Sequence, residues 1–170
     1  MTDGYTKEAR AFLALICWAE GTSLGGRDPY RVVYGYGHAI QSFRDHPAIT
    51  GEWTGKPLPP KYCRAAGLSA GCKSTAAGAY QITRTTWLDR SLRWFYTPTS
   101  FSPAEQDSFC WRALCRSLGV PRLLDIGKVE AAISAASARW ASLPKSAAGQ
   151  PQRTMDQCLA VYRRGLENAP

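Results

Sequence analysis

The chain has 170 residues, of which 45% are hydrophobic and 20% charged. This length predicts one domain over residues 1–170, and the composition is ordinary for a soluble globular protein. The sequence has no apolar run near the ~20 residues that cross a bilayer and no signal-peptide pattern, so we expect no integral membrane segment and synthesis in a cytoplasm. The formal charge of +8 favours an anionic partner, such as nucleic acid, anionic lipid or an acidic cell-wall polymer.

The six cysteines show no metal-binding spacing, because the sequence has no Cys-x-x-Cys pair and neither histidine follows a pair of cysteines. We therefore expect no metal and no cofactor. Four cysteines fall in helical patterns, where a free thiol packs as a small apolar group. Cys63 and Cys72 flank a short Gly- and Ala-rich loop. A disulfide between them requires an oxidising compartment and stays open.

The first predicted helix starts at Thr6, a good N-cap residue, and runs to about Ala19 or Glu20, where Gly21 is a natural stop. Phe12, Ile16 and Glu20 are four residues apart, so they share one stripe of this helix. A stripe that buries the two apolar side chains also draws in the carboxylate of Glu20.

Glu20 is therefore a candidate catalytic acid. The negative end of the helix dipole and the burial beside Trp18 both disfavour the ionised form, so both raise the pKa of this carboxyl. A glutamic acid that stays protonated near neutral pH can donate its proton to a glycosidic oxygen. The alternative is a solvated glutamate at a helix end without a catalytic role.

Residues 21–73 are rich in Gly and Pro and have no helical period. Residues 30–34 are β-branched and aromatic, and they end at a Gly-Tyr-Gly sequence, which predicts a small hairpin or three-stranded sheet. A long irregular loop follows through residues 56–60. A loop of this length inside one domain indicates a function, such as forming the lip of a binding cleft.

The rest of the chain predicts helices. Residues 74–81 lead into a helix that extends to about residue 92. The next helix starts at Ser102-Pro103-Ala104-Glu105, an N-cap, a proline and the acid of a capping box, and ends at Gly119. A helix over residues 129–140 ends by Pro144, and a second capping box from Thr154 to Gln157 starts the last helix. The fold class is therefore α+β, mostly helical, with one small β element.

Taken in order, several segments resemble the bacteriophage lambda lysozyme family of lytic transglycosylases, which has the lysozyme-like fold. The resemblance covers about residues 11–150 and rests on five groups of residues in the family's order: 11–13 with 18–22, 45–47, 73–81, 101–103 with 106–107, and 140–144. It implies that the small sheet or hairpin forms a lip of the substrate cleft.

The resemblance also implies the chemistry. Glu20 matches the family's single catalytic residue, which protonates the oxygen between N-acetylmuramic acid and N-acetylglucosamine. As a carboxylate it then takes the proton of the muramoyl 6-hydroxyl, which closes on the anomeric carbon to give a 1,6-anhydro end. Internal attack by a positioned hydroxyl needs proximity and one acid/base, whereas hydrolysis usually needs a second carboxylate.

Further positions carry over from the same resemblance. Ser74, Tyr80 and Gln81 are expected to bind substrate near Glu20, with Tyr80 offering an aromatic surface. Asp45, His46 and Trp140 are expected to be structural. The chain departs from the family at residues 52–72, where it is longer, and at Ala148, where the family has an aromatic residue.

Two rival functions stay open at this point. The first is a hydrolytic lysozyme that uses Asp28, Asp45 or Glu52 as a second acid. The second is a non-catalytic basic module that binds a cell wall; nucleic acid is not expected, because the Lys and Arg residues are dispersed and form no known motif. The resemblance favours a phage endolysin, expected to be a monomer, that waits in the host bacterial cytoplasm and reaches peptidoglycan through a holin-type membrane pore.

Overall fold

The computed structural model describes residues 4–65, 67–146 and 151–168. Its first helix, α1, spans Lys7–Ala19 and begins at Thr6, whose Oγ1 accepts a hydrogen bond from the Ala9 amide at 3.2 Å. Glu20 is the C-cap residue, and Gly21 follows with a φ of +74°, a left-handed conformation that favours glycine. The predicted beginning and end of this helix are confirmed.

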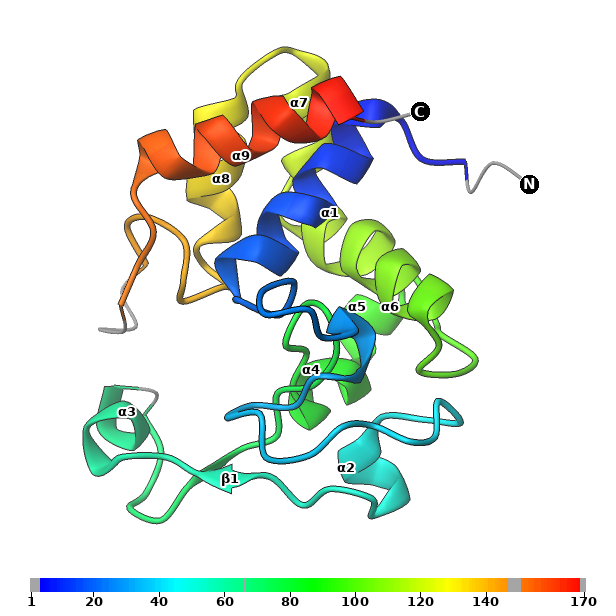
Figure 1. Ribbon diagram of the computed structural model, residues 1–170, viewed down its shortest axis with the longest axis vertical. Coiled ribbons are helices and arrows are strands. Elements are labelled where there is room, and N and C mark those ends of the chain that lie inside the picture. The colour runs from blue at the N-terminus through cyan, green and yellow to red at the C-terminus, as the bar shows by residue number, and fades with distance from the viewer. Residues whose placement is uncertain (1–3, 66, 147–150, 169–170) are drawn as a thin grey trace.

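Helix α1 packs against the final helix of the structure, α9 (Met155–Asn168), and the two lie side by side in the helical part of the molecule (Figure 1). The rings of Phe12 and Tyr162 meet edge to face at 6.4 Å. A Cβ on Gly165 would lie 2.9 Å from the Cα of Ala11, so the two backbones approach closely at this point. The predicted capping box of α9 is confirmed, because Thr154 and Gln157 exchange backbone-to-side-chain hydrogen bonds of 3.0 and 3.2 Å.

Several shorter helices complete the helical part, and they surround a core built on Phe12, Trp87, Phe101, Phe109 and Ile133. Their bounds are α4 Arg84–Leu88, α5 Arg90–Arg93, α6 Pro103–Phe109, the π-helical segment η2 Cys110–Cys115, α7 Val120–Asp125 and α8 Val129–Ala136.

Three details of the predicted helices are wrong. The helix expected to extend to about residue 92 is interrupted at Asp89, whose extended backbone ends α4 and whose side chain caps α5. Ser102 caps α6, but Glu105 does not close the box. Its carboxylate accepts from the Tyr96 hydroxyl at 3.0 Å and from the Thr99 amide at 3.1 Å, which ties the preceding loop to the helix. Helix α8 ends at Ala136, before the predicted Trp140, which lies buried in the turn that follows.

The small β element is present, but its predicted position is wrong. Asp28 caps a short 3₁₀ helix, η1 (Pro29–Arg31), where a strand was expected, and only isolated bridges join Val32 to Ala39 and Val33 to Ala77. The two-stranded antiparallel sheet is instead formed by β1 (Lys56–Pro57) and β2 (Lys73–Ser74), with Lys56 opposite Ser74 and Pro57 opposite Lys73.

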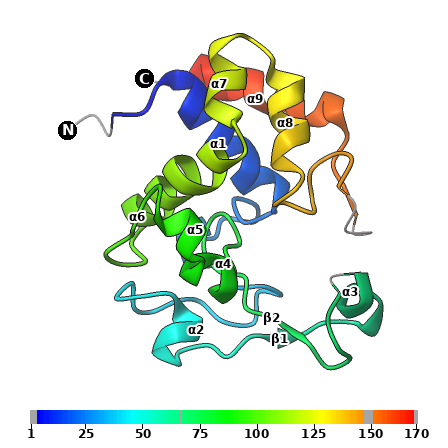
Figure 2. The same cartoon turned by 180° about the vertical axis from the view of Figure 1, so that it is seen from behind.

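Strand β1, helix α3 (Pro60–Ala65) and strand β2 form a projecting unit at the edge of the molecule in both views (Figures 1 and 2). We call residues 56–65 and 67–74 the finger. A disulfide joins Cys63 to Cys72 with a Cα–Cα distance of 5.8 Å, which resolves the open question of these two cysteines. The other four cysteines are free and buried, as their helical patterns predict.

Candidate active site

Glu20 lies at the last turn of α1, where its amide donates to the Ile16 carbonyl at 2.9 Å. Its neighbours Ala19 and Thr22 are buried, and Glu20 itself is partly exposed. Burial raises the pKa of the Glu20 carboxyl above its ordinary value, more strongly than the Ser142 hydroxyl and the Arg153 cation lower it. Glu20 is thus an acid with access to solvent that resists ionisation, which a proton donor requires.

The hydroxyl of Ser142 donates a hydrogen bond of 2.5 Å to Oε1 of Glu20. Ser142 lies in the turn after α8, where Trp140 and Leu143 are buried. Trp140 donates from Nε1 to the Tyr80 carbonyl at 3.0 Å, which fixes this turn and bears out a structural role for Trp140. The sequence did not identify Ser142 as a contact of Glu20, since no local pattern relates the two residues.

Arg153 is a second contact that the sequence did not reveal. Its guanidinium lies over the ring of Trp18 at 4.6 Å, and its amide donates to the Ser142 carbonyl at 2.8 Å. Arg153 therefore holds the segment before α9 against both the end of α1 and the Ser142 turn. Its charge lies close enough to lower the pKa of Glu20.

The three predicted substrate-binding residues lie on the segment after the finger. Ser74 ends β2 and accepts from the Ala76 amide at 3.3 Å, and Gln81 has a φ of +48° and donates from Nε2 to the Gly78 carbonyl at 3.1 Å. Both residues are half-buried. Within the described ranges no hydrogen bond joins Glu20 to Ser74, Tyr80 or Gln81. Their substrate-binding roles stay predictions.

Tyr80 differs from the expectation of an exposed aromatic surface. The residue is only 3% exposed, and its hydroxyl donates to Oδ1 of Asp107 at 2.6 Å. Tyr30 donates to the other oxygen of Asp107 at 3.3 Å. The ring of Tyr80 is therefore too buried for a sugar to stack on it, and its hydroxyl is held by Asp107.

The loop carboxylates considered as second acids all have structural contacts. Asp28 caps η1 and lies 3.4 Å from the Arg31 guanidinium. Asp45 accepts from the Trp87 indole at 2.8 Å and from the His46 amide at 2.7 Å. Neither carboxylate makes a hydrogen bond to Glu20 in the part of the chain that the structure describes.

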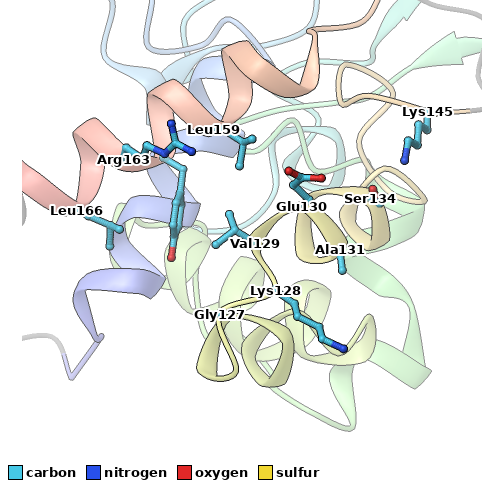
Figure 3. A pocket seen from close by; sticks show the side chains of 11 residues that line it. Gly127, Lys128, Val129, Glu130, Ala131, Ser134, Lys145, Leu159, Arg163 and Leu166 are labelled. Atoms are coloured by element: carbon cyan, nitrogen blue, oxygen red, sulfur yellow. The ribbon is translucent and has the colours of Figure 1, made fainter.

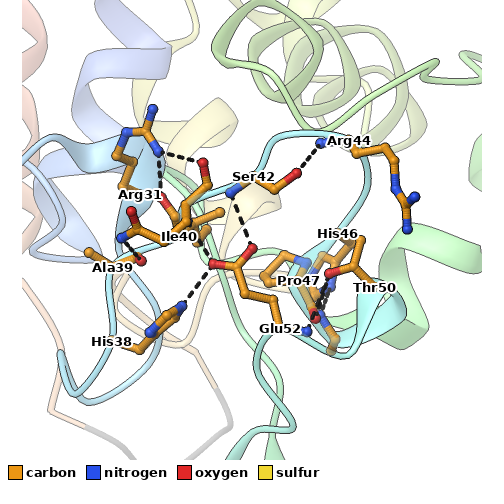
Figure 4. Close-up of polar contacts among 12 residues, drawn as sticks. Arg31, His38, Ala39, Ile40, Ser42, Arg44, His46, Pro47, Thr50 and Glu52 are labelled. Atoms are coloured by element: carbon orange, nitrogen blue, oxygen red, sulfur yellow. Dashed lines mark hydrogen bonds and ion pairs between the residues drawn. The ribbon is translucent and has the colours of Figure 1, made fainter.

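Glu52, the third of these carboxylates, organises residues 38–42 (Figure 4). Its carboxylate accepts from the amides of Gln41 at 2.6 Å and Ser42 at 3.2 Å, and it lies 2.8 Å from Nε2 of His38. Burial opposes ionisation of Glu52, but these hydrogen bonds together outweigh it, so the pKa of Glu52 is lowered. Glu52 therefore stays ionised more readily than an ordinary glutamate, which suits its role in holding residues 38–42 in place.

His46 has the packing role that its sequence context favours. It is fully buried, Nε2 lies 2.9 Å from the Ile82 carbonyl, and Nδ1 accepts from the Ala48 amide at 3.2 Å at the start of α2 (Pro47–Thr50). Burial lowers the pKa of His46 to about 4. The ring is neutral near pH 7, with the proton on Nε2 by this hydrogen-bond pattern.

Gly35 and Tyr36 together link the finger to the end of α1, which the sequence did not predict. The Tyr36 hydroxyl donates to the Gly21 carbonyl at 3.5 Å, and the residue is 51% exposed, with its ring beneath the Arg27 guanidinium. The preceding residue, Gly35, is covered by Lys56 of β1, because a Cβ on Gly35 would lie 2.6 Å from the Lys56 Nζ. Lys56 of the finger thus contacts Gly35, and the adjacent Tyr36 contacts Gly21, which follows Glu20 in the chain.

A groove of about 720 Å³ lies between α8 and α9 (Figure 3). Its lining includes Val129, Leu159 and Leu166 together with Glu130, and it contains neither Glu20 nor Ser142. We therefore do not assign the acid chemistry to it. Among the described residues no cluster of three or more His, Cys, Asp or Glu side chains suits a metal ion, and no helix is long and apolar enough to cross a membrane.

Ala148, where the family has an aromatic residue, lies outside the described residues.

The chain is similar in sequence to the endolysins of two phages. The chain is 28% identical to the endolysin of Escherichia phage lambda over 160 residues, covering 92% of this chain and 89% of that protein. It is 29% identical to the endolysin of Escherichia phage P2 over 153 residues, covering 90% and 89%.

Among solved structures, the chain is similar to bacteriophage lambda lysozyme complexed with a chitohexasaccharide, with a TM-score of 0.73, 28% identity and 95% coverage of both chains. A further structure of lysozyme from bacteriophage lambda gives a TM-score of 0.72 at 26% identity, again with 95% coverage of both chains. These matches confirm the α+β, lysozyme-like fold. The Endolysin family model matches residues 10–168, and the chain therefore belongs to the Endolysin family.

Proposed function

We propose that this protein degrades peptidoglycan as a lytic transglycosylase, with Glu20 as its only catalytic carboxyl group. The observation that carries the proposal is the partly exposed Glu20 residue, whose pKa is raised by burial and whose Oε1 accepts a hydrogen bond from Ser142. A related lysozyme binds a chitohexasaccharide, so a β-1,4-linked amino-sugar strand is a reasonable ligand for this fold.

In the proposed reaction, protonated Glu20 donates its proton to the oxygen between N-acetylmuramic acid and N-acetylglucosamine. The bond from that oxygen to the muramoyl anomeric carbon breaks, and N-acetylglucosamine leaves with its new hydroxyl. The muramoyl 6-hydroxyl attacks the anomeric carbon, and the Glu20 carboxylate takes the hydroxyl proton. Glu20 is thereby restored to its protonated form, and the muramoyl sugar ends as a 1,6-anhydro ring.

Ser142 gives the carboxyl group a fixed orientation in both steps. Its hydrogen bond occupies Oε1 of Glu20, which leaves Oε2 as the oxygen that carries and recovers the proton. The same hydrogen bond favours the ionised form of Glu20. Ser142 therefore limits the rise in the pKa of Glu20, so that the carboxyl group can still release its proton.

The hydrolytic alternative needs a second carboxylate that activates water or attacks the sugar. Asp28, Asp45 and Glu52 are each engaged by loop amides or neighbouring side chains, which favours structural roles for all three. This arrangement supports a mechanism with one carboxyl group.

The proposal extends to the route by which the enzyme meets its substrate. We propose that a monomer made in the host bacterial cytoplasm passes through a holin-type pore and acts on the cell wall. The Cys63–Cys72 disulfide supports an enzyme that acts outside the cytoplasm, because disulfides persist in oxidising compartments. The net charge of +8 would concentrate the enzyme on an anionic envelope, less so as salt rises.

Mass spectrometry of digested peptidoglycan tests the mechanism. The expected muropeptides carry anhydro ends, which are one water lighter than reducing ends; products with reducing ends alone would overturn the transglycosylase mechanism. Glu20→Gln is expected to abolish lysis while retaining the fold and glycan binding. Asp28→Asn and Glu52→Gln are the matched controls and are expected to retain anhydro products, whereas undiminished lysis by Glu20→Gln would exclude the proposed acid.

A further inference from the structure

The finger is strongly basic. Residues 56–73 contain four cations and no Asp or Glu, so this segment of 18 residues carries half of the formal net charge of +8. The cations are Lys56, Lys61, Arg64 and Lys73, and all four are exposed. A concentration of one sign of charge on a small projecting unit attracts a partner of the opposite sign.

Within the described ranges, none of these cations forms an ion pair with a carboxylate. Ion pairs there join Arg31 to Asp28 and His38 to Glu52. Lys61 Nζ does lie over the ring of Tyr62 at 4.8 Å, which leaves the charge on the surface of the finger. In a chain with 13 acidic residues, a cluster that pairs with none of those described is available to an external anion. Exposed cations of this kind contribute to binding and little to folding.

The finger holds its cations in a defined arrangement. Besides the disulfide, the Leu58 amide donates to the Cys72 carbonyl at 2.9 Å and the Leu68 amide donates to the Cys63 carbonyl at 2.8 Å. Cys63 is fully buried inside this small unit. A preformed unit loses less conformational entropy on binding than a flexible loop does, so its charges can contribute more to affinity.

The base of the finger contacts a segment that also contacts the end of α1. Lys56 covers Gly35, and the next residue, Tyr36, reaches the Gly21 carbonyl directly after Glu20. Residues 35 and 36 therefore link the finger to the end of α1 that carries Glu20.

We propose that the finger binds the anionic peptide stems of the peptidoglycan strand whose glycan is held at Glu20. This inference rests on the proposed function, since it concerns another part of the same substrate. The stems project from the muramoyl sugars and carry free carboxylates, which match exposed Lys and Arg side chains. The finger would thus add affinity for stem-bearing strands over bare glycan.

An anionic lipid surface is the competing partner for a basic unit. Leu68 is the one large hydrophobic residue of the described finger that is strongly exposed, at 51%. Membrane binding at an interface normally combines cations with a larger buried apolar area. Charge without an apolar face favours the carboxylates of the peptide stems.

The test measures binding by a protein that does not cleave its substrate. The triple variant Lys61→Gln, Arg64→Gln, Lys73→Gln is made in a Glu20→Gln background. A control in the same background replaces three exposed arginines outside the finger, Arg116, Arg122 and Arg163, by glutamine. Both variants lose three positive charges. Each is assayed on intact sacculi, on glycan stripped of its stems by an amidase, and on vesicles with anionic phospholipid.

The finger variant is expected to bind intact sacculi about 5-fold to 20-fold more weakly at low salt than its parent, from three exposed charge contacts. Its binding to stripped glycan should be unchanged, and the control should match its parent on both. A charge-conserving triple variant, Lys61→Arg, Arg64→Lys, Lys73→Arg, should bind intact sacculi as tightly as the parent.

Equal binding of the neutral finger variant and its parent to intact sacculi would overturn the proposal. An equal loss on stripped glycan would also overturn it, because the finger would then act on the sugars or on the fold. A loss confined to the lipid vesicles would overturn it in favour of a membrane as the partner. Wild-type protein that fails to cleave sacculi would instead overturn the proposed function, so the two failures are distinguishable.

Discussion

The hydroxyl of Ser142 lies 2.5 Å from Oε1 of Glu20, although the two residues are 122 positions apart in the sequence. Glu20 comes from the end of the first helix, and the hydroxyl bonded to it comes from the turn after α8. The site is therefore assembled from distant parts of the chain.

Ser142→Ala should shift the pH dependence of activity to higher pH. The hydroxyl lowers the pKa of Glu20, so its loss leaves that pKa higher and the proton bound over a wider range. We expect kcat to fall about 10-fold, because the variant loses the hydrogen bond to the carboxylate that forms when Glu20 gives up its proton. The measurement is the pH–rate profile on purified peptidoglycan. Ser142→Thr, which keeps a hydroxyl, is the control, and an unchanged profile in Ser142→Ala would contradict the orienting role.

Arg153→Met should have a similar effect through charge alone. The guanidinium favours the Glu20 carboxylate, so its removal raises the pKa of Glu20 and moves the activity profile to higher pH. Loss of the contact with Trp18 should also cost about 0.5–1 kcal/mol of stability in urea titrations. Arg153→Lys keeps the charge and should retain the profile; identical profiles for the Met and Lys variants would argue against an electrostatic effect.

Glu20→Gln should be more stable than the wild type at pH 7. Burial raises the pKa of Glu20 in the folded state, so the folded protein binds this proton more tightly than the unfolded chain does. Stability is then lost as pH rises from the ordinary value of 4.5 through the folded pKa, and glutamine avoids that loss. Urea titrations at pH 7 and below pH 4.5 should show the difference disappearing in acid. A difference that is the same at both pH values would contradict the raised pKa.

Acid should destabilise the protein through His46. Its pKa is about 6.5 in the unfolded chain and about 4 in the fold, so protons bind the unfolded state first as pH falls. This lowers the free energy of unfolding by about 3 kcal/mol between pH 6.5 and pH 4. Thermal melts over this range should show a smaller decline in His46→Gln. Parallel declines in both proteins would assign the acid sensitivity to other groups.

Reduction of the disulfide should open the finger. The bond joins residues nine positions apart, and such a loop closure is worth about 2–3 kcal/mol in the chain-entropy description. With reductant, trypsin should cleave faster after Lys61 and Arg64 than at the arginines of α9. The double variant Cys63→Ser, Cys72→Ser should be cleaved equally fast without reductant. Equal resistance with and without reductant would mean that the backbone contacts alone hold the finger.

Much of the helical structure could be predicted from the sequence, because its signals are local. Thr6, Ser102 and Thr154 each cap a helix through an amide three residues ahead. The stripe through Ile16 and Glu20 also predicted the burial that raises the pKa of Glu20. These features depend on the chain within one or two turns, which is the range that periodicity and capping residues describe.

The residues that surround the Glu20 carboxyl group could not be predicted in this way. Ser142 and Arg153 come close to Glu20 only after distant turns pack together. Ser142 lies within the matched segment 140–144, but no local pattern there relates its hydroxyl to Glu20. The small sheet was misplaced for a related reason. Residues 30–34 have strand-forming side chains, but Asp28 and Pro29 start a 3₁₀ helix there. The strands β1 and β2 pair across the finger, whose two sides the Cys63–Cys72 disulfide also joins, and both are too short to show a strand pattern in the sequence.

The close approach of α1 and α9 has a consequence for synthesis. Gly165 packs directly on Ala11, and the ring of Tyr162 contacts that of Phe12. Helix α1, which ends next to Glu20, is therefore stabilised by α9, a helix that leaves the ribosome much later. Ser142 and Arg153 also arrive late. A nascent chain that lacks residues 142–168 has the acid but none of these contacts, so we expect activity to begin only after α9 has emerged.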